Sequence, residues 1–269
     1  MRVLVTGGAG YIGSVTAQAL IAAGHHVVIV DDLSTGHAAA VPEGARLVEF
    51  DLADTLRMTD LLREESVEAV VHFAALSLVG ESMREPLRYY RNNVGGAVAL
   101  LEACAAVGVE RFVLSSTAAV YGHPKSVPIP ETADLRPESV YGETKLAVER
   151  LLDWLAVTRG IGYAALRYFN AAGAVPGRGE DHDPETHLVP LVLQAAMGRR
   201  RSVKLFGTDY PTPDGTAIRD YVHVADLADA HVLALAGVKP GAGTAFNLGS
   251  GEGFSVRQVI DLCKEVTGV

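Results

Sequence analysis

The sequence predicts an α/β protein with a doubly wound parallel, Rossmann-type sheet and a smaller C-terminal substrate-binding lobe. Three observations support this prediction. Short β-rich runs alternate with longer segments of helical periodicity through the first two thirds of the 269 residues. The runs are mostly apolar on both faces, which is typical of parallel strands covered by helices on each side. A glycine-rich turn joins the first run to the first helical segment, as in folds that bind dinucleotides.

The expected strands are all short and mostly apolar: Val3–Thr6, His26–Asp31, Arg46–Phe50, Ala69–Phe73, Phe112–Ser115 and Tyr163–Tyr168. The intervening segments with helical periodicity are 11–23, 55–65, 92–107 and 143–158. Repeated strand–helix units of this kind are joined by right-handed crossovers, so we expect one parallel sheet with helices on both faces.

The character of the sequence changes after Asn170. The elements expected beyond it are, in order, a loop over 174–184, a helix over 187–199, a strand over 203–206, a loop over 209–215 and helices near 225–236 and 255–267. We therefore assign residues 1–170 to a dinucleotide-binding Rossmann domain and residues 171–269 to a smaller lobe for the substrate. This lobe is expected to cap the carboxyl edge of the sheet, where ligands of such folds bind.

The composition argues against a nucleic-acid binder and against a membrane-spanning protein. With 23 basic and 32 acidic side chains the net charge is −9, which argues against a non-specific nucleic-acid binder because such proteins need a basic surface. No segment approaches the roughly 18 apolar residues of a membrane span. The first strand begins at the start of the sequence, so we expect no signal peptide and a cytoplasmic protein. Cys104 and Cys263 are expected to be reduced thiols.

Gly7, Gly10 and Gly13 form the turn between the first strand and the first helix. Without β-carbons the backbone can turn sharply and approach a pyrophosphate, and the helix N-terminus offers N–H groups and a positive dipole end. Asp31 ends the second strand, where a carboxylate accepts hydrogen bonds from ribose hydroxyls and repels a 2′-phosphate. The pattern therefore predicts NAD as the cofactor. Asp51 lies at the end of the third strand, where its carboxylate could face the adenine amino group or simply be solvated.

Tyr141 and Lys145 lie four positions apart, so on a helix both side chains project from one face. A free tyrosine, with a pKa of about 10, is a poor base at neutral pH. A nearby cation favours the phenolate, and we expect Lys145 to bring the pKa of Tyr141 toward the working range. Thr117 follows the fifth strand, and its hydroxyl can share the hydrogen bond to a substrate oxygen.

This combination resembles the extended short-chain dehydrogenase/reductase family, and more closely still its UDP-glucose 4-epimerase members. The stretches that carry the resemblance are Val3–Ser14, His72–Ala75, Val79–Ser82, Tyr89–Asn93, Leu166–Asn170, Phe206–Thr212 and Asp214–Val224. The glycine loop is common to the whole superfamily, whereas the last two stretches are far more specific. The resemblance covers essentially the whole sequence.

The resemblance implies roles for individual residues. Around NAD it places Gly7, Gly10, Tyr11, Ile12 and Gly13 at the pyrophosphate, Asp31 at the ribose, Asp51 and Leu52 at the adenine, Phe73 and Ala74 along the cofactor, and Asn93, Lys145 and Tyr168 at the nicotinamide end. Around a UDP-sugar it places Asn170 and Arg219 at the diphosphate and the backbone of Lys204, Leu205 and Phe206 near the uracil.

The resemblance also implies a reaction. Tyr141 acts as the base on the sugar 4-hydroxyl, with Thr117 as its hydrogen-bonding partner. Hydride leaves C4, a 4-keto sugar turns over about its diphosphate link, and the hydride returns to the other face. This sequence of steps interconverts UDP-glucose and UDP-galactose. A homodimer through the helices near 81–107 and 143–158 is implied as well.

The sequence departs from the family pattern at three places. Ser77 stands where some members carry a lysine, and His187 stands where an asparagine often contacts the diphosphate. The sequence also ends at Val269, directly after a helical pattern, whereas family members continue. We therefore expect a truncated chain that binds NAD but has weak affinity for the nucleotide sugar.

Three alternatives remain open at this point. A 4-epimerase of another UDP-sugar (UDP-N-acetylglucosamine, a UDP-pentose or a UDP-uronic acid) differs in pocket size, which these residues do not reveal. An NDP-sugar dehydratase usually carries a carboxylate pair after the threonine, where this sequence has Ala118 and Ala119. The third alternative is an inactive NAD-binding fragment or a non-enzymatic NAD-sensing scaffold, and such a scaffold would have no need for the tyrosine, lysine and threonine together.

No metal is expected, because the candidate histidines lack metal-ligand spacing. These histidines are His72, His182, His187, His223 and His231.

Overall fold

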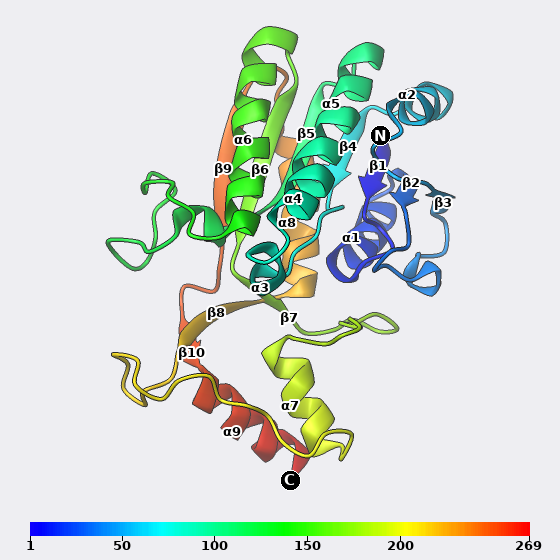
Figure 1. Ribbon diagram of the computed structural model, residues 1–269. Helices are drawn as coiled ribbons and strands as arrows, with labels where there is room; N and C mark the ends of the chain where they lie inside the picture. Colours follow the sequence, from blue (N-terminus) through cyan, green and yellow to red (C-terminus); the bar gives the residue numbers. More distant parts are fainter.

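The computed structural model describes residues 1–269 and is built on a seven-stranded sheet (Figure 1). From one edge to the other the strands are β3 (Arg46–Glu49), β2 (His26–Asp31), β1 (Arg2–Thr6), β4 (Ala69–His72), β5 (Arg111–Thr117), β6 (Gly162–Tyr168) and β9 (Gly243–Leu248). Every neighbouring pair is parallel. The strand order reverses between β1 and β4, so the predicted doubly wound parallel sheet is confirmed.

Helices cover both faces of this sheet (Figure 1). One face carries α2 (Thr55–Glu64), α5 (Gly96–Val107) and α6 (Val140–Arg159). The other face carries α1 (Tyr11–Ala22) and α8 (Val224–Gly237), which pack against each other. None of the helices is long and apolar enough to cross a membrane.

The strands are apolar on both faces because they supply two hydrophobic cores. Successive side chains of a strand point to opposite faces, so in β1 Leu4 enters the core under α5, while Val3 and Val5 enter the core under α1. Leu100 of α5 and Leu20 of α1 are fully buried in these two cores. Burial on each side explains why the sequence shows continuous apolar runs and no alternation.

Helix α6 begins and ends at residues with clear local reasons. The Ser139 hydroxyl accepts a hydrogen bond from the Gly142 backbone N–H (3.1 Å), which is a side-chain N-cap. At the other end Gly160 takes a left-handed conformation with φ of +73°. The helix therefore starts three residues before the predicted position 143, and it includes Tyr141 in its first turn.

The chain after residue 170 does not form one separate lobe. It contributes a three-stranded sheet of β7 (Asn170–Ala172), β8 (Ile218–His223) and β10 (Gly253–Ser255), and α7 (Leu188–Ala196) packs on α9 (Val256–Thr267). These elements lie beyond the carboxyl ends of the large sheet (Figure 1). Between them, α8 and β9 return to the large sheet.

The predicted division at residue 170 is therefore wrong for the segment that contains α8 and β9. Strand β9 pairs in parallel with β6, from Tyr163 opposite Gly243 to Tyr168 opposite Leu248. As an edge strand it is largely exposed, so its sequence lacks the apolar run that marks the central strands.

The strand predicted over 203–206 is also wrong. This segment has no regular secondary structure, and Phe206 is 82% exposed. An isolated apolar run needs a neighbouring strand to satisfy its backbone groups, and no strand pairs with it here.

Candidate functional site

A cleft of about 1030 Å³ lies at the carboxyl ends of the parallel strands. Its position includes the point between β1 and β4 where the strand order reverses, which is where open α/β sheets bind ligands. Most of the residues singled out in the sequence line it: Gly7, Gly10, Tyr11, Ile12, Gly13, Asp31, Asp51, Leu52, Phe73, Ala74, Thr117, Tyr141, Lys145, Tyr168, Asn170 and Arg219.

The glycine turn fits the pyrophosphate of a dinucleotide. A β-carbon on Gly13 would lie 2.2 Å from the Gly7 carbonyl oxygen, and one on Gly7 would lie 2.5 Å from the Ala74 backbone nitrogen. Gly10 is the N-cap residue of α1, where no side chain caps the helix and no acidic residue stands in the first turn. The first N–H groups of α1 thus have no side-chain partner, which leaves them and the helix dipole for an anion in the cleft.

Asp31 is held at the edge of the cleft by backbone donors. Its Oδ2 accepts a hydrogen bond from the Ala9 N–H (2.9 Å), and its Oδ1 accepts one from the Leu33 N–H (2.9 Å). Burial raises the pKa of this carboxyl, the two backbone bonds lower it, and the neighbouring charge of Asp32 raises it. Each carboxylate oxygen keeps a free lone pair, so both can also accept from ribose hydroxyls.

Tyr141, Thr117 and Lys145 meet on the wall of the cleft, as the sequence predicts. The Tyr141 backbone N–H donates to the Ser82 hydroxyl (3.1 Å), which anchors the first turn of α6. One turn further along, the buried Lys145 ammonium donates to the Ser115 carbonyl oxygen (2.9 Å) at the end of β5. Strand β5 and helix α6 together therefore position the phenol, the hydroxyl and the cation.

The electrostatics of this trio differ from the prediction. Burial raises the pKa of Tyr141 to about 12, and a hydrogen bond with Thr117 opposes the rise. The lowering expected from Lys145 is not seen in this structure, in which its ammonium donates to the Ser115 carbonyl oxygen, and for the NAD-bound protein it stays a prediction. Burial also lowers the pKa of Lys145 to about 8, while the negative charge of Glu149 partly offsets this by raising it. Lys145 is still mostly protonated at neutral pH.

The sequence reasoning missed Glu149, which lies one further helical turn beyond Lys145. This buried carboxylate accepts a hydrogen bond from Arg167 Nη2 to Oε2 (2.6 Å) and another from Arg167 Nε to Oε1 (3.1 Å). The Ser116 hydroxyl also donates to it. Because Glu149 follows Lys145 at the same spacing that separates Lys145 from Tyr141, the regular four-residue step was the signal for it.

Asn170 and Arg219 lie at the side of the cleft formed by β7 and β8. The Asn170 amide donates to the Asp220 carbonyl oxygen (2.8 Å), which ties β7 to β8. The Arg219 guanidinium donates to the carbonyl oxygen of its neighbour Ile218 (2.9 Å) and forms no ion pair. The neighbouring Asp220 carboxylate accepts hydrogen bonds from the backbone N–H groups of Ser250 and Gly251. The charge of Arg219 is therefore available to an anion.

Four predicted residues do not line the cleft. Asn93 lies in η2 (Tyr90–Gly95), a π-helical turn, and is buried behind the wall: its amide oxygen accepts from the Leu76 N–H (2.8 Å) and its amide nitrogen donates to the Leu76 carbonyl (3.0 Å). It therefore shapes the wall through Leu76. Its neighbour Asn92 does reach the cleft. The other three are Lys204, Leu205 and Phe206, which lie outside the lining.

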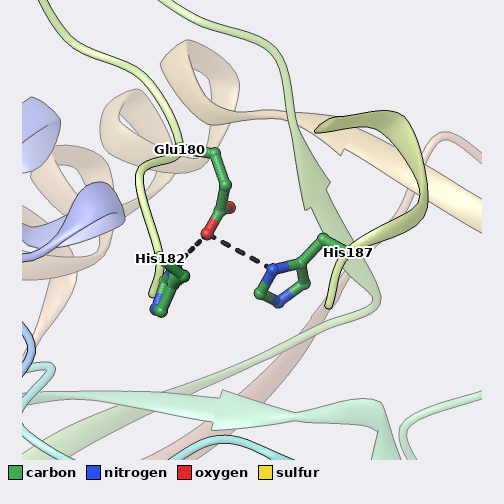
Figure 2. Close-up of side chains that lie close together, drawn as sticks. All are labelled: Glu180, His182 and His187. Atoms are coloured by element: carbon green, nitrogen blue, oxygen red, sulfur yellow. Dashed lines mark hydrogen bonds and ion pairs between the residues drawn. The ribbon is translucent and has the colours of Figure 1, made fainter. Parts of the chain in front are cut away.

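A loop that precedes α7 closes another side of the cleft and contributes Glu180, His182 and His187 (Figure 2). His187, which departs from the asparagine often found at this position in the family, lines the cleft. Glu180 and His182 were not expected there, because loop positions carry no periodicity from which their direction could be read.

Residues 3–249 match the NAD dependent epimerase/dehydratase family. The chain belongs to this family. A UDP-glucose 4-epimerase of Lacticaseibacillus casei is 51% identical over 271 residues, which cover 100% of this chain and 82% of the relative. A crystal structure of UDP-glucose 4-epimerase from Brucella ovis in complex with NAD has a TM-score of 0.94 at 47% identity, and covers 98% of this chain and 82% of its own.

A second solved structure extends the comparison to a nucleotide. The UDP-glucose 4-epimerase of Bifidobacterium longum, in complex with NAD⁺ and UDP, has a TM-score of 0.95 at 35% identity, and the match covers 100% of this chain and 84% of that one. These similarities confirm the resemblance that the motifs indicated. Membership of an NAD dependent family also confirms the expected cofactor.

Replacement of Asp31 by alanine tests the assignment of the ribose site. We expect NAD binding to weaken by roughly tenfold to a hundredfold, since hydrogen bonds to a charged group contribute about 1.5–3 kcal/mol, and we expect NADP to be rejected less strongly. Titration of the cofactor-free protein with each dinucleotide measures both effects. The control is Asp54→Ala, which removes the N-cap of α2 outside the cleft. Unchanged preference for NAD over NADP in Asp31→Ala would contradict the assignment.

Proposed function

We propose that this protein interconverts UDP-glucose and UDP-galactose by NAD-dependent epimerisation at C4 of the sugar. The observation that carries the proposal is the meeting of Tyr141, Thr117 and Lys145 beside the glycine turn, in a chain about half identical to curated UDP-glucose 4-epimerases. Ala118 and Ala119, which follow Thr117 in the cleft wall, offer no carboxylate for the elimination that a dehydratase performs.

The chain supplies the proton chemistry of this reaction. Tyr141 takes the proton of the sugar 4-hydroxyl and later returns it, while the Thr117 hydroxyl shares the hydrogen bond to the same oxygen. NAD, when bound, supplies the acceptor and donor of hydride. Since the proton leaves an oxygen and the hydride leaves C4, the sugar passes through a 4-keto form that must present both faces in turn.

The raised pKa of Tyr141 sets a requirement for this role. A phenol whose pKa is about 12 is almost entirely protonated at neutral pH, so catalysis needs positive charge close to the oxygen in the loaded enzyme to favour the phenolate. Lys145 is the cation within one helical turn, and its own pKa of about 8 leaves it charged at neutral pH. Glu149, paired with Arg167, favours that charged form and so acts as a positioning residue.

The substrate diphosphate requires cationic and amide donors on the opposite wall. Arg219 offers an unpaired guanidinium there, with Asn170 beside it. Both residues line the same cleft as Tyr141, so one nucleotide sugar can reach both groups. The adjoining β7, β8 and α7 elements form the part of the molecule that we assign to nucleotide-sugar binding.

Incubation of the purified protein with UDP-galactose, without added cofactor, tests the proposed function directly. We expect UDP-glucose to form, because NAD that is regenerated in every turnover need not be supplied. Chromatography of the reaction over a range of UDP-galactose concentrations measures the conversion. Parallel reactions with UDP-N-acetylglucosamine, a UDP-pentose and a UDP-uronic acid compare the alternative sugars. If the protein releases NAD on denaturation yet converts only one of these other sugars, the proposed substrate is wrong.

Tyr141→Phe is expected to leave NAD bound and to lower turnover by roughly a hundredfold or more, because it removes the group that exchanges the proton. A matched control is Tyr163→Phe, which also deletes a phenol oxygen from the domain, but one that bonds to Asp153 away from the cleft. The turnover of the two variants at saturating substrate shows whether Tyr141 acts as the base. Near-normal turnover of Tyr141→Phe would exclude it as the base.

We also propose that the protein is a cytoplasmic homodimer that acts in galactose metabolism. Large apolar side chains are exposed on the outer surface of the neighbouring helices α5 and α6, and among them Trp154 and Val157 of α6 are 70% and 81% exposed. Removal of such a patch from water is a common driving force for dimers. This surface coincides with the two helices from which the sequence implied a dimer.

Sedimentation velocity measures this association. We expect the unmodified protein to sediment as a dimer and the double variant Trp154→Glu/Val157→Glu as a monomer, since charge on a buried interface opposes association. The control is Leu233→Glu, which places the same charge at a 73% exposed apolar position on α8, on the other face of the sheet. A monomeric unmodified protein at micromolar concentration would contradict the proposal.

A further inference from the structure

Glu180, His182 and His187 form a compact cluster of metal-ligating side chains in the loop before α7 (Figure 2). One nitrogen of each imidazole and one carboxylate oxygen all lie within 4.8 Å of one another. A single oxygen, Glu180 Oε1, serves both rings: it pairs with His182 Nδ1 and lies 3.4 Å from His187 Nδ1. Two imidazoles that converge on one carboxylate oxygen surround a point where a small cation could bind all three groups.

The surroundings of the cluster hold it in place. The Glu180 side chain is 11% exposed and that of Glu185 is 7% exposed. Glu185 Oε1 accepts from the backbone N–H of His187 (2.8 Å) and contacts the His187 ring at Nδ1 (2.8 Å). Glu185 thus contacts the same ring nitrogen that faces Glu180, and these contacts fix the orientation of the His187 ring toward the two carboxylates.

The charge of the loop also favours a cation. Glu180, Asp181, Asp183 and Glu185 place four carboxylates within six residues. Arg178, the nearest cation along the chain, is turned away toward Gln18 and the Ala40 carbonyl. A divalent cation would offset the repulsion among these carboxylates.

We propose that Glu180, His182 and His187 bind one divalent transition-metal ion of the zinc class. Imidazole nitrogens select such ions over Mg²⁺ and Ca²⁺, which prefer oxygen ligands. Three protein ligands leave one position of a tetrahedral zinc site open. All three residues line the cleft that holds Tyr141, so a water or an oxygen of a bound molecule can take this position from the cleft.

This site reverses the expectation that the protein holds no metal. That expectation depended on spacing along the sequence, and the separation of five residues from His182 to His187 matches no helical or strand period. The loop brings the two rings within 5.2 Å, centre to centre, by folding back on itself. The inference concerns metal binding alone, so it stands apart from the proposed epimerase activity.

Isothermal titration of the chelator-treated protein with Zn²⁺ tests the proposal. We expect saturable binding of one ion per chain that millimolar Mg²⁺ does not prevent. His182→Ala and His187→Ala are each expected to lower the zinc affinity at least about tenfold, since loss even of a second-layer group costs roughly 10–100-fold. Glu180→Gln, which keeps the shape but removes the charge, is expected to weaken binding as well.

The matched control is His123→Ala. His123 pairs with Glu138 at an exposed position, so it offers one imidazole beside one carboxylate but no second ring. Its replacement is expected to leave the zinc affinity unchanged. Retained NAD and an unchanged unfolding temperature show that each variant is folded. The proposal is overturned if the unmodified protein binds no zinc at one ion per chain, or if His182→Ala and His187→Ala bind it as tightly as His123→Ala.

Discussion

The turn between β1 and α1 is the contact on which the rest of the site depends. Gly13 stands so close to the Gly7 carbonyl, and Gly7 so close to the backbone of Ala74, that a methyl group at either position would force the first helix away from the sheet. This approach places the N-terminus of α1 at the switch point between β1 and β4. The cofactor site, the position of Asp31 across from the turn and the packing of α1 on α8 all follow from it.

The second determinant is helix α6, which carries its functional groups at a constant four-residue step. Tyr141 faces the cleft, Lys145 reaches the end of β5, and Glu149 meets Arg167 of β6. A buried ion pair adds little net stability, yet loss of one partner costs about 3–5 kcal/mol because it leaves an uncompensated charge. The pair therefore fixes α6 against β5 and β6. This also fixes the positions of Tyr141, Thr117 and Lys145 at the cleft, because they lie on β5 and α6.

The walls of the cleft differ in how firmly they are built. The sheet side consists of strand ends and helix starts embedded in two cores, whereas the opposite side consists of β7, β8 and the loop over 180–187. A scaffold that is rigid on one side and formed by loops on the other suits a reaction in which the hydride geometry stays constant while the sugar changes the face that it presents. The zinc-class site, if occupied, would tie that loop into the wall.

The sequence by itself determined the parallel sheet, the glycine turn, Asp31 and the tyrosine–lysine pair, because each depends on local periodicity or on the sterics of a few neighbouring residues. It did not determine that β9 returns to the sheet, since an exposed edge strand leaves no apolar run, nor that Asn93 turns behind the wall and Lys204–Phe206 lie outside it. The pKa of Tyr141 and the cluster of Glu180 with two histidines were decided by tertiary structure alone. Both depend on burial and on distances between side chains that no spacing along the chain encodes.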